Sequence, residues 1–432
     1  MLWIERKIVK YRNVESNREC VHHVLIARAG GKNILLSHAN LFLHAHALAS
    51  IETSARYSTV IAMFYRFLSS QKKFLQIDVG NYHVLADNGD IKRWQIARQI
   101  ERVKQQKTSP NSGTIFEDAK IVLFFFSWIQ DEGYTSNVRV KKVTWCPNFK
   151  AQRMLNYVQA KARIKIDSKN IEVLDKERRQ RKAASLISQL EIVELIQSYI
   201  DPVYATLFKL SLGTAMRPMD LCKFPYIGNG KNKHIMPYSS MRKNDDQTID
   251  FHVIESKGKK DRTIKINVAD MRMVEDEYIR PYYADRAAKF EKKFGKKCPP
   301  SLLFLNKDGA PITSLMISSR TYDAKKIAMK NCSEFRESIK FYDARHWWPT
   351  MFLINFFKER LLSEAADALY LAAAQVLLNQ MGHNELSTTF KYYVDMARLV
   401  LMAHEGSVHE LITKPTETVE QFVHKIHSSS LI

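Results

Sequence analysis

Apolar residues recur at the three- to four-residue spacing of helices through most of the chain, and strand-like patterns are confined to two short regions. Near the N-terminus, the β-prone stretches 21–28 and 33–36 flank a Gly-Gly pair that suits a tight turn. Farther along, apolar and polar residues alternate in 249–253 and again in 264–266, after a Gly-Lys-Lys-Asp sequence. The pattern predicts two antiparallel hairpins in a chain that is otherwise mainly helical.

The first 165 residues are predicted to hold two units. Residues 1–48, with the first hairpin, are interpreted as an N-terminal appended unit. Residues 49–165 are predicted to form a helical domain, with helices at 51–70, 91–107, 114–131 and 152–162.

The predicted helix at 91–107 is basic on one side. Its apolar positions fall on one stripe, formed by Ile91, Trp94, Ala97, Ile100 and Val103. The cationic residues are expected to face away from that stripe; they are Lys92, Arg93, Arg98, Arg102, Lys104 and Lys107. Such a face is typical of a surface that contacts a polyanion.

Apolar periodicity stops between residues 166 and 184, where charge dominates, so a basic linker is predicted there. Residues 185–405 are predicted to form a second, mostly helical domain with the second hairpin inside it. An additional Ala-rich helix is expected at 365–380. The tail, 406–432, is predicted to contain a short helix with an apolar face. Because a helix this short is unstable alone, it is expected to dock in a groove, in its own subunit or in a neighbouring one.

Charge and cysteine content narrow the function further. The 432 residues include 66 Lys and Arg against 45 Asp and Glu, a formal net charge of +21. This excess points to a polyanionic partner, nucleic acid first and an anionic membrane surface second. The longest apolar runs, 121–126 and 351–357, are far shorter than a membrane span, and the five cysteines lack a CxxC pair. We therefore expect a cytoplasmic, nucleoid-associated protein with no membrane segment, disulfide framework or metal site.

Four sequence motifs then occur in a fixed order. They are Thr-Ala-Met-Arg-Pro-Met-Asp-Leu at 214–221, Ser-Lys-Gly at 256–258, Tyr-Asp-Ala-Arg-His at 342–346 and Gly-His-Asn-Glu-Leu-Ser-Thr-Thr-Phe-Lys-Tyr at 382–392. Together they resemble the boxes of the tyrosine recombinase (phage integrase) family, namely TGMRxxEL, the hairpin lysine, HxLRH and LGHxxxxTTxxY. The resemblance includes the nine-residue step from His383 to Tyr392.

The resemblance implies a role for each motif residue. Arg217, Arg345 and His383 would bind the scissile phosphate, and Lys257 would protonate the departing 5′ oxygen. Tyr392 would attack phosphorus and form a 3′-phosphotyrosine, which stores the energy of the cleaved bond and needs neither metal nor ATP. Two guanidiniums suit this task because the transition state carries extra negative charge on non-bridging oxygens.

For the whole chain, the resemblance implies a site-specific recombinase or integrase of a mobile element or phage. The expected fold class is mainly α with a small antiparallel β-sheet. A helical core-binding domain and a catalytic domain would form a C-shaped clamp on double-stranded DNA, and four protomers would act on paired sites. The basic linker adds Arg178, Arg179 and Arg181 to the predicted DNA contacts.

The sequence departs from the family pattern at Tyr342, where the family has histidine. A phenol is a poorer proton acceptor than imidazole at neutral pH, and His346 is considered as a partial substitute. Two alternatives therefore stay open: a catalytically weakened DNA-binding accessory protein, and a DNA-relaxing enzyme of the type IB topoisomerase kind. At the nucleophile, spacing favours Tyr392, and its neighbour Tyr393 is expected to pack. For the proton donor, Lys259 and Lys260 are alternatives to Lys257.

Overall fold

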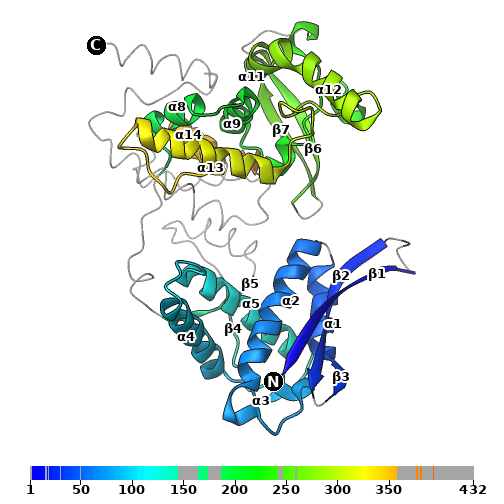
Figure 1. The fold of residues 1–432 in the computed structure, drawn as a ribbon, viewed down its shortest axis with the longest axis vertical. Helices are drawn as coiled ribbons and strands as arrows, with labels where there is room; N and C mark the ends of the chain where they lie inside the picture. Colours follow the sequence, from blue (N-terminus) through cyan, green and yellow to red (C-terminus); the bar gives the residue numbers. More distant parts are fainter. Residues whose placement is uncertain are drawn as a thin grey trace, which may run out of the picture. The chain divides into compact units, whose positions relative to one another are not determined.

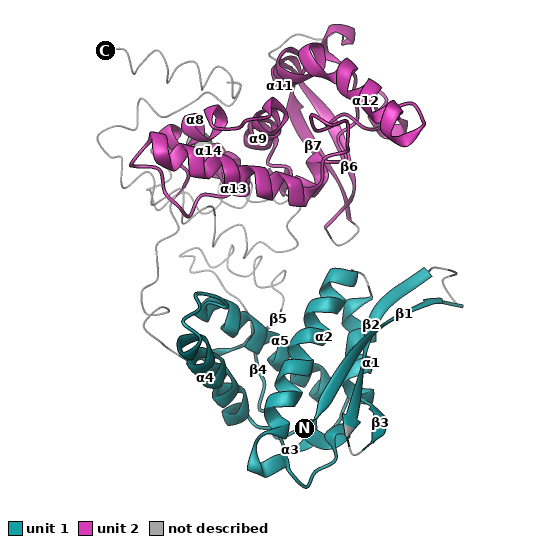
Figure 2. Ribbon diagram, in the orientation of Figure 1, with its two compact units in different colours: residues 1–145, 163–183 teal, residues 146–162, 184–432 magenta. Residues whose placement is uncertain are grey.

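The chain forms two compact units, shown in Figure 2. The computed structural model describes residues 2–144, 164–173, 186–241, 247–257 and 260–357, with short gaps at 15–16, 18, 30 and 49, together with 376–377, 380–381 and 393. Unit 1 comprises residues 1–145 and 163–183, and unit 2 comprises residues 146–162 and 184–432. Each unit has its own buried apolar cluster. The predicted fold class, mainly helical with small antiparallel sheets, is confirmed.

Unit 1 begins with a three-stranded antiparallel sheet in the order β1 (Trp3–Arg12), β2 (Glu19–Ala29), β3 (Lys32–Leu35), visible in Figure 1. The predicted hairpin is the β2–β3 pair, whose turn contains Gly31 at a φ of +78°. Strand β1 was not predicted, because its side chains are mostly exposed and only Ile4 is buried, which leaves no clear apolar alternation.

Helices complete unit 1 and cover the same core as the sheet. They are α1 (Ser37–Ala47), α2 (Ile51–Ser69), α3 (Tyr82–Leu85), α4 (Asn88–Lys104) and α5 (Ser112–Asp131), with the short 3₁₀ turns η1 (Lys72–Phe74) and η2 (Val79–Asn81). Ile4 and Leu25 from the sheet pack in one cluster with Phe42 of α1 and Phe125 of α5. Residues 1–48 therefore share a hydrophobic core with the helices that follow.

A second small sheet ends unit 1. Strand β4 (Lys141–Thr144) pairs antiparallel with β5 (Ile164–Asp167), and the 3₁₀ turn η3 (Lys169–Ile171) follows. Ile171 is fully buried, and its carbonyl accepts a hydrogen bond from Gln95 of α4 at 2.8 Å. The fold of unit 1 thus extends into the predicted linker. The predicted helix at 152–162 and the arginines Arg178, Arg179 and Arg181 lie outside the described residues.

Helix α4 differs from its prediction in which side chains it buries. Ile91 and Trp94 are buried as expected, but Ile100 and Val103 are 49% and 68% exposed, so the predicted stripe covers only the first turns. Arg98 does not face away: it donates to Asp118 of α5 at 2.8 Å and lies over the Trp94 ring. The physical reason is the buried carboxylate on α5, which the sequence pattern of α4 alone does not reveal.

The other cationic residues of α4 are placed as follows. Arg93 pairs with Asp90, a member of the capping box at the start of the helix. Arg102 donates to the carbonyl of Pro110 at 3.1 Å. Lys92 is half-buried, and Lys104 is exposed at the last turn. The basic surface of α4 is therefore smaller than predicted.

Unit 2 contains the packed helix pair α9 and α14 and the β6–β7 hairpin (Figure 1). Its elements are α8 (Gln189–Gln197), α9 (Pro202–Thr214), α10 (Pro218–Leu221), η4 (Gly230–Asn232), η5 (Tyr238–Ser240), β6 (Thr248–Ser256), β7 (Lys260–Asn267), α11 (Val268–Val274), the π-helix η6 (Glu275–Tyr283), α12 (Ala284–Phe294), α13 (Ser314–Asn331) and α14 (Asp343–Phe357). The predicted capping box of Ser188 and Glu191 and the predicted second hairpin are both confirmed.

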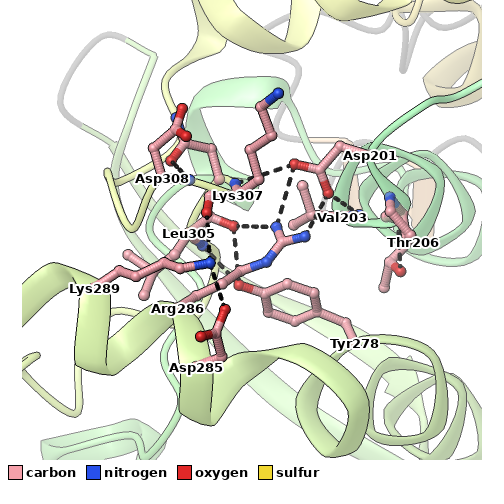
Figure 3. Close-up of polar contacts among 12 residues, drawn as sticks. Asp201, Val203, Thr206, Tyr278, Asp285, Arg286, Lys289, Leu305, Lys307 and Asp308 are labelled. Carbon is pink, nitrogen blue, oxygen red and sulfur yellow. Dashed lines mark hydrogen bonds and ion pairs between the residues drawn. The ribbon is translucent and has the colours of Figure 1, made fainter.

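A buried ion pair fastens the start of α9 to α12, as Figure 3 shows. Arg286 of α12 binds both carboxylate oxygens of Asp201 and donates to the Leu305 carbonyl at 2.7 Å. Asp201 also caps α9 by accepting from the backbone N–H of Val203. The guanidinium lies over the ring of Tyr278, whose hydroxyl bonds to Leu305. This cluster holds helices and a loop together.

Candidate active site

The first motif forms a sharp turn that presents Arg217. Helix α9 ends at Thr214, and Ala215 follows in the left-handed region with a φ of +56°. The Thr214 hydroxyl donates to Leu210 and accepts from the backbone N–H of Met216. Arg217 is then the N-cap of the short helix α10, with Pro218 at its first position. The chain reversal directs the partly buried Arg217 side chain to the end of β6, where it donates to Ser256 at 3.1 Å.

Arg345 lies in the first turn of α14 and is completely buried. Its guanidinium donates to the carbonyls of Ala215 and Met381, and among the described residues its Nε has no partner. Burial, reinforced by the nearby charge of Arg217, lowers the pKa of Arg345 to about 10. The structure thus brings Arg217 and Arg345, predicted from separate motifs, to one place.

A third arginine, Arg262 of β7, joins them and was missed by the sequence analysis. It donates to Ser256 and to Asp220 of α10, both at 2.8 Å, and its Nε has no partner in the described residues. Burial lowers its pKa, and the charge of Arg217 adds to this effect. A signal was available: Arg262 shares the strand face of Ile264 and Ile266, which are buried, and an arginine at a core-facing position needs a partner.

The cluster therefore has a surplus of positive charge. The guanidiniums of Arg217, Arg262 and Arg345 lie near one another, and among the described residues Asp220 is the carboxylate that pairs with two of them, Arg217 and Arg262. Ion-pair distances from Asp220 are 2.8 Å to Arg262 and 3.9 Å to Arg217. Buried cations at this density favour the binding of an anion with several oxygens.

The hairpin holds Lys257 directly beyond Ser256, and Lys257 is exposed. A bulge precedes it, with Glu255 at a φ of +48°. Lys223 donates to the Glu255 carbonyl at 2.9 Å, and the Glu255 N–H donates to Asp261 at 2.8 Å. Lys260 is exposed at the start of β7, whereas Lys259 lies outside the described residues. The base of the turn is thus fixed by local contacts.

Tyr342, at the family's histidine position, is 41% exposed. Its ring contacts the His346 ring edge to face at 5.2 Å and lies 5.9 Å from the Arg345 guanidinium carbon. The phenol is thus beside the arginine cluster.

His346 is next to Arg345 but bonds elsewhere. Its Nδ1 is 3.2 Å from the hydroxyl of Tyr393, and burial, with the charge of Arg345, lowers its pKa to about 4. His346 is therefore neutral at pH 7 and a weak proton acceptor, which makes it a poor substitute for the missing histidine. Tyr393 is buried, so the expectation that this member of the tyrosine pair packs is confirmed.

The segment before His383 is tied to the site by Gln380 and Met381. The Gln380 side chain accepts from the Lys265 N–H at 3.0 Å and donates to the carbonyls of Lys265 and Thr214. Met381 accepts from Arg345. His383 and Tyr392 themselves lie outside the described residues, as does most of the predicted helix at 365–380.

The described residues contain neither a candidate metal site nor a membrane-spanning helix. No group of three or more His, Cys, Asp and Glu side chains is close enough there to hold a metal ion. In the same part of the chain, every helix is too short or too polar to cross a membrane.

Comparison with known proteins gave structural likeness only. No family model matches the sequence, and no curated protein does either. Among solved structures, the chain is similar to the Tn1549 transposon integrase in complex with circular intermediate DNA, with 14% identity, a TM-score of 0.48, and coverage of 85% of this chain and 98% of that one.

Two further structures are similar at the same level. A lambda integrase fragment bound to a core site has 13% identity and a TM-score of 0.44, over 83% of this chain and 95% of that one. The XerH site-specific recombinase bound to its difH substrate has 14% identity and a TM-score of 0.45, over 86% of each chain. Since these TM-scores lie below 0.5, the function has to be inferred from the chain's own residues.

Proposed function

We propose that the chain is a tyrosine recombinase that cuts and rejoins double-stranded DNA at specific sites. The observation that carries this proposal is the meeting of Arg217 and Arg345, from motifs 128 residues apart in the sequence (345 minus 217), in a cluster where the described residues supply less negative than positive charge. A phosphodiester supplies the missing negative charge, and its non-bridging oxygens suit planar N–H donors.

In this proposal each predicted residue performs one step. Arg217 and Arg345, with His383, bind the phosphate and stabilise the charge that develops on its oxygens. The Tyr392 oxygen attacks phosphorus, the bond to the 5′ oxygen breaks, and Lys257 gives that oxygen a proton. The exposed position of Lys257 at the hairpin tip leaves its side chain free to reach a bound duplex. Religation reverses these steps with a new 5′ hydroxyl.

Binding of the duplex is assigned to both units. Lys92, Arg93, Arg102 and Lys104 of α4, with Arg178, Arg179 and Arg181, remain the proposed phosphate contacts outside the active site, and Arg98 acts within unit 1 instead. The C-shaped clamp, action as a tetramer on paired sites, origin from a mobile element or phage, and a cytoplasmic, nucleoid-associated location are further parts of the proposal. The charge of +21 supports the binding of a polyanion.

A second candidate is a DNA-binding accessory protein with weak or no cleavage. The position of Tyr342 and the low pKa of His346 favour it, because neither side chain is a good proton acceptor at neutral pH. A third, DNA relaxation of the type IB topoisomerase kind, keeps the same chemistry. Strand exchange between two duplexes separates it from recombination.

Covalent trapping tests the proposal. The protein is incubated with a pool of nicked duplexes of random sequence, and DNA that stays attached under denaturing conditions is recovered and the linked peptide mapped. We expect an adduct at Tyr392, and none with Tyr392→Phe, which still binds DNA because only one hydroxyl is lost. Tyr393→Phe is the matched control and should keep the adduct. Absence of any adduct with the native chain would favour the accessory protein, and an adduct at Tyr393 would refute the assigned nucleophile.

A further inference from the structure

The hydroxyl of Ser256 uses its full hydrogen-bonding capacity inside the arginine cluster. A serine hydroxyl has one donor and two acceptor positions. Ser256 donates to Asp220 at 3.1 Å and accepts from Arg217 at 3.1 Å and from Arg262 at 2.8 Å. The residue is 3% exposed, so water does not replace these partners.

This arrangement restricts the direction of Arg217. Asp220 is 3.9 Å from the Arg217 guanidinium, and its closer partner is Arg262, so the shorter contact of Arg217 is the one with Ser256. Arg262 takes the nearer place on the carboxylate and one acceptor position of the Ser256 oxygen, and Arg217 donates to the other acceptor position. A long flexible side chain loses little rotamer freedom on binding if a hydrogen bond already holds it in place.

We propose that Ser256 is a positioning residue that holds Arg217 in place for the phosphate, with Arg262 and Asp220 orienting the Ser256 hydroxyl. The proposal rests on the proposed function, in which Arg217 binds the scissile phosphate. It assigns to the residue directly before Lys257 a role that acts through Arg217 rather than through the neighbouring lysine.

A double-mutant cycle tests it with the full chain and a nicked duplex chosen by covalent capture from the random pool. Ser256→Ala should slow single-turnover cleavage about tenfold, the size expected for one hydrogen bond to a charged group. In the Arg217→Ala background the same substitution should change the rate less than about twofold, because there is no guanidinium left to position. An equal loss in both backgrounds, or no loss in the native background, overturns the proposal.

Two substitutions separate positioning from folding. Ser256→Cys keeps the shape of the side chain, with a somewhat larger atom, but weakens its hydrogen bonds, and it should reproduce the rate loss if Ser256→Ala does not fold. Thr321→Val in α13 removes a buried hydroxyl that bonds to Tyr199. It should lower stability without changing the cleavage rate. A rate loss in Thr321→Val equal to that of Ser256→Ala would overturn the proposal.

A duplex with sulfur in place of the 5′ bridging oxygen separates Arg217 from Lys257. A thiolate leaves without a proton, so a variant impaired only through Lys257 recovers on this substrate. The Ser256→Ala loss should persist, and its recovery would refute the assignment to Arg217.

If the native chain binds DNA but forms no adduct, the proposed enzyme fails and the positioning role is still measurable. Affinity for a random-sequence duplex is then measured for the four proteins of the cycle: the native chain, Ser256→Ala, Arg217→Ala and the double variant. Ser256→Ala should weaken binding only where Arg217 is present, and equal weakening in both backgrounds counts against the role.

Discussion

Unit 2 contains a buried arginine, Arg286, and an arginine cluster, Arg217, Arg262 and Arg345, and the two differ in how their positive charge is neutralised. Arg286 reaches both oxygens of Asp201 and one carbonyl (Figure 3), and the rings of Tyr278 and Tyr282 lie near its guanidinium. Arg217 and Arg262 share the carboxylate of Asp220, Arg345 bonds to two backbone carbonyls, and in the described residues the Nε atoms of Arg262 and Arg345 have no partner. The first arginine is balanced within the fold, whereas the described residues around the second cluster carry more positive than negative charge. Burial of an arginine therefore indicates a ligand site only where its charge and donors exceed what the protein supplies.

Substitution of one arginine from each group should break different properties. Arg217→Ala should slow cleavage about 10²- to 10³-fold, since a donor to the transition state is lost, and should change stability little. Arg286→Ala should cost about 3–5 kcal/mol of stability, because Asp201 is left buried without its counter-ion. Below its melting temperature, Arg286→Ala should cleave at the native rate. Thermal unfolding and single-turnover cleavage measure the two effects. Equal effects on both properties in both variants would remove the distinction.

Acid should lower the free energy of unfolding of the protein through His346, which lies next to the arginine cluster. The folded pKa of about 4 lies below the ordinary 6.5, so the neutral form is favoured by folding, and this contribution is present above pH 6.5 and lost as the pH falls toward 4. Denaturant unfolding at pH 7 and pH 5 should show a loss of about 1–2 kcal/mol from this group. His346→Gln, which does not titrate, should show a smaller loss. An identical pH dependence in both proteins would contradict the burial of a neutral imidazole.

Helix α4 of unit 1 also contains both paired and unpaired cations, and here the expected effect is a smaller change in DNA affinity. Arg98 is paired with Asp118, whereas Lys92 and Lys104 have no ion pair within the described residues. The double variant Lys92→Glu, Lys104→Glu should weaken binding to all sequences and lower the slope of log K against log salt by about 2. Lys32→Glu in β3 is the matched control and should keep the slope. An unchanged slope in the double variant would mean that α4 does not contact DNA.

Most of the fold follows from local patterns. The alternation of apolar and polar residues predicted strands β6 and β7, and the spacing of Ser188 and Glu191 predicted the start of α8. These signals succeed because capping and strand burial depend on residues close in sequence. Strand β1 was missed because its side chains are mostly exposed, and the inward direction of Arg98 was missed because its partner is on another helix.

The site was predictable only in part. Arg217 and Arg345 were found from motifs, and the structure brings them together through Ala215. Arg262 and Ser256 were not singled out, because their roles depend on the pairing of two strands with α10 and not on neighbours in sequence. The roles of His383 and Tyr392 stay predictions.

The Gln380 side chain has a mechanical consequence. It hydrogen-bonds to both backbone groups of Lys265 and thereby attaches Gln380 to β7, one strand of the hairpin that bears Lys257. In the proposed mechanism Lys257 is the proton donor, so displacement of Gln380 and Met381 from β7 and Arg345 is expected to disturb the arginine cluster and the hairpin together.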